Sequence, residues 1–398
     1  MQISLITNIT PASDNIRGTS ALPYHLMLKR PENIKIDIFS FNFNRLSREK
    51  IAEVEKELGV KIQILPRPKW LDLVIQLHLL FVRVLLRLPI LCYVKLKKKK
   101  MGELISSKPD GIWIYGEEMA RVAKQFQGIR RAQILPDSEA MYYHRMLGSR
   151  FVFKKTSKFW RSMIMYRKYL RLERSFDTDN ITYLTVGEED AKFLKKNNTE
   201  ADARFLRHPH YNVKNPDRPL SFSKPKIKLI LAGQYNYYMQ QTADEWIPQL
   251  CKASSLADKF ELTFLGKGWE RHAESMKAAG WQVQHITFAP DYQEELMLHD
   301  IQLTPIAIGT GTKGKVLDAI ANGLLVIGTW YALENVAVED GVSCICCDEA
   351  ERLPQILEDI AAEPARYERM ALAGREAVLR EHGREKVAKE FFGLFNKA

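Results

Sequence analysis

Apolar and polar positions alternate along the first half of the chain in the way that a parallel α/β domain requires. Amphipathic segments predict helices at 21–30, 47–60 and 188–196. Short apolar runs between them predict buried strands at 2–7, 34–41, 61–66, 111–116, 132–136 and 181–187. Because strands that alternate with helices form crossover units, this pattern predicts a parallel sheet covered by helices.

The same alternation starts again after residue 225. Helices are predicted at 243–258, 270–280 and 292–300, and the chain beyond 347 is mainly helical. Apolar runs predict strands at 227–233, 260–266, 282–288, 301–308, 324–329 and 344–347. The chain therefore contains two α/β domains in tandem, as its length of 398 residues also suggests.

A proline-rich stretch separates the two patterns. Residues 209–225 hold four prolines and little apolar periodicity, which is typical of a linker. We expect a first domain at 1–212, a linker at 213–225, a second domain at 226–375, and C-terminal helices at 376–398 that can pack back on the first domain.

Residues 70–100 contain a long apolar run that a narrow polar stripe interrupts. The interruptions at helical spacing are Asp72, Gln76, Arg83 and Arg87. A membrane-spanning helix needs about 20 nearly uninterrupted apolar residues, so this run does not span. Either its apolar positions are core, or the helix lies in a membrane interface with Lys95 and Lys97–Lys100 at the headgroups.

A second basic and aromatic stretch, residues 151–176, also predicts an amphipathic helix suited to an anionic membrane surface. The whole chain carries a net charge of +11, which favours anionic partners. RNA is the rival partner, but the sequence has no RNA-recognition-motif signature, zinc finger or glycine-rich basic arm, so no nucleic acid is expected.

The five cysteines do not form a disulfide framework, and no signal peptide is evident; a cytoplasmic location is expected.

The stretch GTGTKGKVLDAIANG, residues 309–323, carries the strongest chemical signal. A P-loop reading fails because Val316 stands where Ser or Thr must hold magnesium. A dinucleotide fingerprint should open its domain, whereas few strands follow this stretch. A glycine-rich turn into a helix at 313–322 nevertheless offers backbone N–H groups and a positive dipole end to an anion. Lys313 and Lys315 add positive charge, so a diphosphate site is expected here.

Residues 300–329 resemble the donor-binding segment of GT-B glycosyltransferases of the group 1, family 4-like type. The positions that match are Gly309, Gly311, Thr312, Lys313, Lys315, Val316, Leu317, Ala319, Ala321, Gly323 and Thr329. The segment departs from the family at its two glutamates, which are replaced here by Thr310 and Asp318. Glycine turns at Gly233 and at Gly266 resemble earlier parts of the same donor domain.

The resemblance implies a GT-B fold, with two tandem Rossmann-like domains and a cleft between them. It implies a nucleotide-diphosphate sugar as co-substrate, with no other cofactor and no metal, because Lys313 and Lys315 stabilise the charge that develops on the leaving diphosphate. The implied donor-binding residues are Gly233, Gly266, Phe288, Ala289, Thr310, Gly311, Thr312, Lys313, Lys315 and Asp318.

The acceptor is expected at the first domain. Asp137 follows a strand end, where open α/β sheets place ligands, and is a candidate catalytic base if the enzyme inverts configuration; a helix N-cap explains it equally well. The other residues expected on the acceptor side are Asn8, Arg17, Gly18, Thr19 and Glu139.

The leading hypothesis is a glycosyltransferase that moves a sugar from a nucleotide-diphosphate sugar to a glycan or lipid-linked acceptor. It would work at the cytoplasmic membrane face in polysaccharide biosynthesis, retain anomeric configuration and need no metal. The alternatives are a GT-B sugar-nucleotide epimerase, which needs no basic membrane-facing helices, and a non-catalytic GT-B binding protein, which the loss of the glutamate pair suggests.

Overall fold

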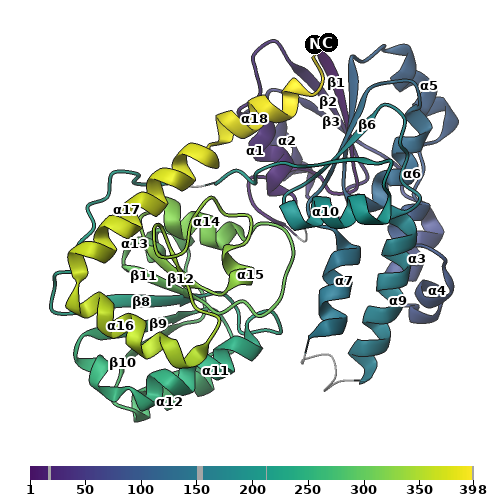
Figure 1. The fold of residues 1–398 in the computed structure, drawn as a ribbon. Coiled ribbons are helices and arrows are strands. Elements are labelled where there is room, and N and C mark those ends of the chain that lie inside the picture. Colours follow the sequence, from purple (N-terminus) through teal and green to yellow (C-terminus); the bar gives the residue numbers. More distant parts are fainter. Residues whose placement is uncertain (17–18, 150–155, 212, 397–398) are drawn as a thin grey trace. The chain divides into compact units, whose positions relative to one another are not determined.

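The computed structural model describes residues 1–16, 19–149, 156–211 and 213–396. The chain forms two compact units, one made of Met1–Pro209 with Arg384–Ala398 and the other of His210–Gly383. Each unit is built on its own parallel sheet with helices packed beside it (Figure 1). The predicted fold class, two Rossmann-like α/β domains, is confirmed.

The first unit holds a seven-stranded sheet in the order β3-β2-β1-β4-β5-β6-β7. All six neighbouring pairs are parallel, and β1 pairs with both β2 and β4. The strands are β1 (Gln2–Thr7), β2 (Lys35–Ser40), β3 (Lys61–Ile64), β4 (Gly111–Tyr115), β5 (Arg131–Leu135), β6 (Ile181–Thr185) and β7 (Asp202–Phe205). The strands are short and apolar because helices bury the sheet on its faces.

The helices of the first unit follow the strands along the chain. The α-helices are α1 (Ala21–Leu28), α2 (Arg48–Leu58), α3 (Lys69–Gln76), α4 (Leu80–Leu85), α5 (Lys98–Ser106), α6 (Ala120–Ala123), α7 (Glu139–Gly148), α9 (Thr156–Glu173), α10 (Glu188–Asn197) and the C-terminal α18 (Arg384–Gly393). The 3₁₀ turns are η1 (Ile90–Tyr93), η2 (Glu117–Met119) and η3 (Lys124–Phe126).

The second unit holds a six-stranded parallel sheet in the order β10-β9-β8-β11-β12-β13. Its strands are β8 (Ile227–Ala232), β9 (Phe260–Leu265), β10 (Gln282–Ile286), β11 (Ile301–Thr304), β12 (Leu325–Gly328) and β13 (Ile345–Cys346). Its helices and turns are α11 (Gln240–Lys252), η4 (Ser254–Asp258), α12 (Glu270–Ala278), α13 (Tyr292–Met297), α14 (Gly314–Ala321), α15 (Trp330–Leu333), η5 (Ala350–Arg352), α16 (Leu353–Ala362) and α17 (Pro364–Glu381).

Both sheets share a topological switch point. In the first unit the chain moves outward from β1 to β2 and β3, then returns to the other side of β1 with β4. The second unit repeats this arrangement with β8 in the place of β1 and β11 in the place of β4. The loops that leave two such adjacent strands diverge, and the crevice between them at the carboxyl edge is where α/β sheets bind ligands.

The predicted single helix through residues 70–100 is wrong. The segment is split into α3, α4, η1 and α5. His78 adopts a positive φ of 49° between α3 and α4, and Pro89 precedes η1, so neither position continues a helix. Strand β7 at Asp202–Phe205 was not predicted from the sequence, because it is short and only one of its four residues is buried.

The segment predicted as a linker packs on the second unit. Phe222 is buried in that unit's core, and Lys224 forms an ion pair with Asp300 at 2.7 Å. At the other end, the chain returns to the first unit at Arg384, eight residues after the expected boundary at 376. There the α18 residues Phe391 and Phe392 pack on Trp113 of β4.

No helix within the described ranges is long and apolar enough to cross a membrane.

Candidate functional site

The glycine-rich loop that the sequence singled out lies at the switch point of the second sheet. It connects β11 to α14, and β8 beside it ends in the turn at Gly233. Helix α14 begins at Gly314 with Lys313 as its N-cap, as predicted to within one residue. The first turn of a helix has N–H groups without intrahelical acceptors, so this end of α14 faces the crevice with a positive dipole.

Lys315 is the cation that reaches the neighbouring strand end. Its Nζ lies 3.5 Å from the position that a Cβ on Gly233 would occupy, and 5.6 Å from the centroid of the Tyr292 ring. The side chain is accessible to solvent. Desolvation by the surrounding protein lowers the pKa of Lys315, while the charge of Asp318 raises it. A bound anion would stabilise the charged form in the same way as Asp318.

The side chain of Lys313 forms hydrogen bonds within its own loop. Its Nζ donates to the carbonyl oxygens of Thr310 at 2.8 Å and Gly311 at 2.9 Å, and lies 3.6 Å from Glu334. The Nδ2 of Asn335 donates to the same Gly311 carbonyl at 3.0 Å. These contacts fold residues 309–313 into a closed turn. The two lysines, equivalent in the sequence, therefore have different surroundings in the structure.

Two further glycines allow the turns at this edge to pack closely. A Cβ on Gly266 would lie 2.4 Å from the Gly233 carbonyl oxygen, and Gly266 has a φ of +133°. The indole Nε1 of Trp269 donates to that same carbonyl at 2.7 Å and fixes the turn. Gly233 and Gly266 thus lie together with Lys315. Their role in binding a donor stays a prediction.

The remaining predicted donor residues surround this edge. Phe288 follows edge strand β10 and is 75% exposed, while Ala289 packs beside the core that includes Val316 and Leu317 of α14. Thr310 and Thr312 are partly exposed within the loop. Sequence reasoning missed Tyr292, Glu334 and Asn335 as site residues. No motif signals them: Tyr292 begins α13 and lies beside Lys315, whereas Glu334 and Asn335 follow α15 and reach Lys313 and Gly311 of the loop.

A carboxyl-lined pocket of about 240 Å³ lies at the switch point of the first sheet. Asn8 follows β1, the pair Glu117 and Glu118 follows β4, and Asp137 with Glu139 follows β5. The described residues that line it are Asn8, Ile9, Thr19, Leu91, Tyr115, Gly116, Glu117, Glu118, Pro136, Asp137 and Glu139. We call this the carboxyl pocket.

The structure places four predicted acceptor-side residues in the carboxyl pocket: Asn8, Thr19, Asp137 and Glu139. Arg17 and Gly18 lie outside the described residues. Asp137 is not the cap of α7, because the N-cap is Ser138, whose side chain accepts a hydrogen bond from the Met141 N–H. Sequence reasoning missed Glu117 and Glu118, since two acids after a strand are typical of a solvated loop.

Burial dominates the electrostatics of the carboxyl pocket. It raises the pKa of Glu117 and Glu118, and nearby carboxylates raise that of Glu117 further. Burial, with the charges of Glu118 and Asp137, raises the pKa of Glu139 to about 8. Burial also raises the pKa of Glu173 to about 7, although Ser138 and Asn197 donate hydrogen bonds to it.

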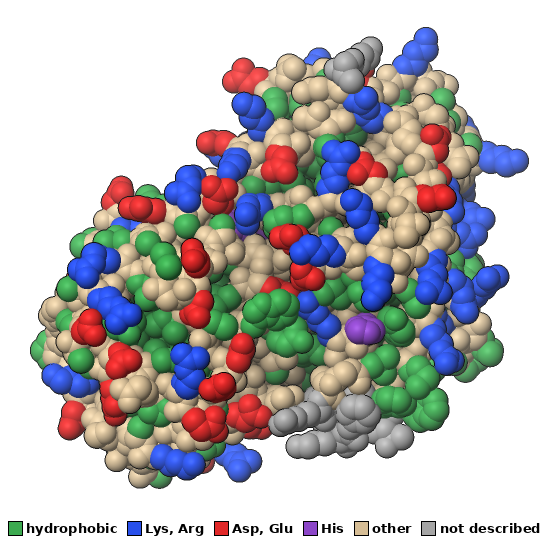
Figure 2. All heavy atoms as spheres, viewed as in Figure 1, with side chains coloured by type: hydrophobic (Ala, Val, Ile, Leu, Met, Phe, Trp, Pro, Cys, Tyr) green, Lys and Arg blue, Asp and Glu red, His purple; other side chains and the backbone are tan. Residues whose placement is uncertain are grey.

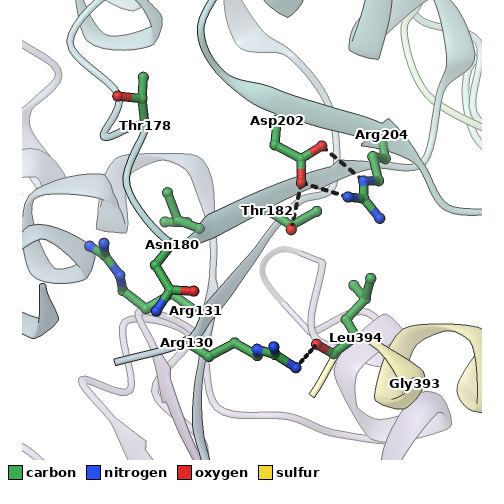
Figure 3. Close-up of a pocket in the computed structure, with 10 residues that line it drawn as sticks. Arg130, Arg131, Thr178, Asn180, Thr182, Asp202, Arg204, Gly393 and Leu394 are labelled. Atoms are coloured by element: carbon green, nitrogen blue, oxygen red, sulfur yellow. Dashed lines mark hydrogen bonds and ion pairs between the residues drawn. The ribbon is translucent and has the colours of Figure 1, made fainter. Parts of the chain in front are cut away.

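A second cavity in the first unit, of about 510 Å³, is a poorer candidate (Figure 3). It lies at the amino ends of β5, β6 and β7, the edge opposite the switch-point loops. Its charges are satisfied within the protein: Arg204 pairs with Asp202 at 2.8 Å, and Arg131 with Asp177 at 2.7 Å. Within the described ranges, no three His, Cys, Asp or Glu side chains are arranged to hold a metal ion.

Comparison with known proteins agrees with this geometry. Residues 244–393 match the family described as glycosyl transferase-like. No curated protein sequence matches the chain.

Several solved structures share the fold over nearly the whole chain. HepE of Anabaena in complex with UDP-glucose has a TM-score of 0.60 and 10% identity, covering 98% of each chain. WaaG, a glycosyltransferase involved in lipopolysaccharide biosynthesis, has a TM-score of 0.58 and 13% identity, covering 98% of this chain and 100% of its own. A Staphylococcus aureus TarM variant in complex with UDP has a TM-score of 0.62 and 8% identity over 100% of both chains.

Proposed function

We propose that the chain transfers a sugar from a nucleotide-diphosphate sugar to a glycan or lipid-linked acceptor. Its residues 244–393 match the glycosyl transferase-like family, and the whole chain shares the two-domain fold of the similar solved structures. The observation that carries the proposal is the loop at residues 309–313, which leads into α14 with Lys315 beside the Gly233 turn. The N–H groups at a helix N-terminus and a lysine side chain at the same crevice can both bind the oxygen atoms of a diphosphate. Similar structures that contain UDP or UDP-glucose support the same class of donor.

The protein's role in the reaction is to stabilise the leaving diphosphate. The bond between the anomeric carbon and the diphosphate oxygen breaks, and a bond from an acceptor hydroxyl oxygen to that carbon forms. Lys315 and the amide end of α14 interact more strongly as negative charge grows on the leaving oxygen, which lowers the barrier. We propose that the acceptor proton passes to the departing phosphate, that configuration is retained, and that no metal takes part.

Each donor residue has a proposed role. Lys313 and Asn335 hold the loop in its closed form by donating to its carbonyl oxygens, Lys313 to those of Thr310 and Gly311 and Asn335 to that of Gly311. Glu334 forms an ion pair with Lys313. Phe288 offers an exposed ring on which the nucleotide base can stack. Asp318 and Thr310 replace the glutamates that contact the sugar in the family, so the sugar is held by shorter side chains here.

We propose that the acceptor enters the carboxyl pocket of the first unit. The pocket is at the switch point of its sheet, as the donor loop is at the switch point of the other sheet. Asp137 and Glu139 then contact acceptor hydroxyls.

We further propose that the first unit binds an anionic membrane surface through α3, α4, α5 and α9. Phe81 is 63% and Leu85 80% exposed. Trp70, Leu73, Leu77, Val84 and Trp160 are also exposed. Lys168 of α9 donates to the carbonyls of Arg83 and Leu86, which ties this apolar surface together. Figure 2 shows Lys and Arg side chains close to apolar ones along the right-hand edge of this unit.

The placement of lysines on α5 supports the membrane proposal. Lys97 is the N-cap and Lys98–Lys100 form the first turn of α5, where the helix dipole disfavours positive charge. An anionic surface outside the protein would offset this unfavourable position.

The transfer proposal is tested by incubating the protein with labelled nucleotide sugars and membrane lipid extracts. The expected result is label in the glycolipid fraction with the anomeric configuration of the donor, in the presence of EDTA. If the protein epimerises the nucleotide sugar in the absence of an acceptor, the transfer proposal is wrong and the protein is an epimerase. Tight nucleotide-sugar binding with no product from any acceptor would favour a non-catalytic binder.

The membrane proposal is tested by vesicle sedimentation. Changing Lys97, Lys98 and Lys99 together to Glu should abolish binding to vesicles with anionic lipid. The helix α5 should stay folded in this variant, because acidic side chains are favourable at a helix N-terminus. The matched control changes Lys252, Lys259 and Lys277 of the second unit to Glu, with the same change in net charge. Equal loss of binding in both variants, or unchanged binding in the first, would refute the assignment of this surface.

A further inference from the structure

His382, which follows α17, is a completely buried histidine that forms hydrogen bonds to two separate segments of the second unit. The residue is 0% exposed, and its own N–H donates to the Val378 carbonyl oxygen at 2.9 Å, which ends the helix. Its ring Nε2 accepts from the Ala337 N–H at 3.0 Å. Its carbonyl oxygen accepts from the His210 N–H at 2.9 Å. Because a backbone N–H can only donate, the ring Nε2 carries no proton.

The side-chain hydrogen bond of His382 holds the irregular chain at residues 334–338, which we call the bracing segment. This segment in turn bonds to the glycine-rich loop at residues 309–313. Within it, Asn335 donates from Nδ2 to the Gly311 carbonyl oxygen at 3.0 Å. The ring of His382 is therefore connected to the loop through one short stretch of chain.

Packing fixes the bracing segment between its two hydrogen bonds. Val336 is 7% exposed and belongs to the same apolar core as Val316 of α14 and Val378 of α17. Asn335 has a φ of 67°, a left-handed conformation that asparagine tolerates better than most residues. A change at the His382 end is therefore passed along a segment that has little freedom to absorb it.

The backbone hydrogen bond of His382 lies where the chain passes between the two units. The chain leaves the first unit after Pro209 and returns to it at Arg384. The bond from the His210 N–H to the His382 carbonyl oxygen joins the chain beside these two passages. One residue thus contacts both the bracing segment and the chain that links the units.

We propose that His382 is a positioning residue for nucleotide binding: through the bracing segment it holds the loop at residues 309–313 in the form that binds the diphosphate. Because His382 is completely buried, it acts without touching the nucleotide. This inference rests on the proposed function, since it concerns the same loop. Coupling between two places in a protein is reciprocal, so a bound nucleotide also restrains the chain at His210.

The test compares two buried histidines of the second unit by calorimetry with UDP, GDP, dTDP, CDP and ADP. His382→Phe keeps a ring but lacks the acceptor, and it should weaken binding of the preferred nucleotide by about tenfold, the value of one hydrogen bond. His382→Gln retains an acceptor oxygen and should restore most of the affinity.

The matched control is His299→Phe, which should leave nucleotide binding unchanged. His299 is 4% exposed, and its ring Nδ1 bonds to the Glu295 carbonyl oxygen at 2.8 Å, so the control also removes a buried hydrogen bond. It lies before β11, at the edge of the sheet opposite the loop.

Hydrogen exchange separates positioning from a general loss of stability. In denaturant that gives each protein the same global stability, the amides of residues 309–313 and 334–338 should exchange faster in His382→Phe than in His299→Phe. Added nucleotide should slow exchange of the His210 amide in the wild type. If His382→Phe does not fold, Asn335→Gly takes its place, because glycine keeps the positive φ and removes the donor to Gly311; it should abolish the nucleotide effect at His210.

Equal effects of His382→Phe and His299→Phe on binding and on exchange of the loop would overturn the inference, as would a His210 amide that does not respond to bound nucleotide. In either case, nucleotide binding by the wild type shows that only the assignment of His382 fails. If the folded wild type binds none of the five nucleotides, the proposed function fails and the inference fails with it.

Discussion

Single residues at the glycine-rich loop, residues 309–313, have surroundings that the sequence does not show. Lys313 and Lys315 occupy one motif, yet Lys313 is bonded to its own loop and Lys315 extends toward the Gly233 turn. The fold of the loop sets the position of each amine. Glu334, which is buried and lies 21 residues after Lys313, forms an ion pair with the Lys313 amine. A motif can specify that two cations are present without specifying which one meets the ligand.

This difference predicts distinct outcomes for the two lysines. Lys315→Met should weaken nucleoside-diphosphate binding by about 10- to 100-fold, the value of one or two charge-assisted hydrogen bonds, with little change in thermal stability. Lys313→Met should lower both thermal stability and binding, since it opens the loop. Calorimetry with UDP and GDP, beside Lys277→Met as an exposed control, measures this. A fall in stability for Lys315→Met as large as for Lys313→Met would contradict the assignment.

The pKa of Glu139 gives a second residue-scale prediction. Its folded value of about 8 exceeds the ordinary 4.5, so between these pH values the folded state holds a proton that the unfolded state has released. Stability from this group is present at low pH and is lost as pH rises toward 8. Denaturant unfolding at pH 5, 6.5 and 8 should show a smaller decline with pH for Glu139→Gln than for the wild type. Parallel curves would show that Glu139 titrates normally.

At the scale of elements, the sequence predicted most strands and helices, because apolar periodicity reports burial directly. It also predicted the glycine-rich turn and the start of α14 to within one residue, since glycines and a helical pattern adjoin there. It failed at residues 70–100, where the break at His78 and Pro89 interrupts an otherwise helical pattern. It also missed Glu117 and Glu118, whose burial arises only when β1, β4 and β5 bring their loops together.

The close packing of the turns after β8 and β9 predicts a strong effect of one methyl group. Gly266→Ala should lower the free energy of unfolding by about 2–4 kcal/mol, because the new Cβ would contact the Gly233 carbonyl in a backbone conformation that alanine disfavours. Gly280→Ala is the matched control: its φ is +89° but no atom lies within 4 Å, so about 1 kcal/mol is expected. Denaturant unfolding of both variants measures the difference, and equal losses would refute the packing argument.

For the whole molecule, the two units repeat one architecture with opposite chemistry at the switch point. The second unit presents a helix N-terminus and a lysine there, and the first unit presents carboxyl groups. A helix N-terminus beside a lysine suits a diphosphate. The exposed apolar side chains and the α5 lysines support the proposed contact of the first unit with an anionic surface.

The most direct test of the account is a thermal-shift measurement on the full chain with UDP, GDP, dTDP, CDP and ADP and their common sugars, with and without EDTA. The account predicts that one diphosphate stabilises the protein, by about 2.7 kcal/mol at a hundredfold excess over its dissociation constant, and that EDTA does not change the shift. A folded protein that none of these nucleotides stabilises would contradict the central claim that the loop at residues 309–313 is a nucleotide-sugar site.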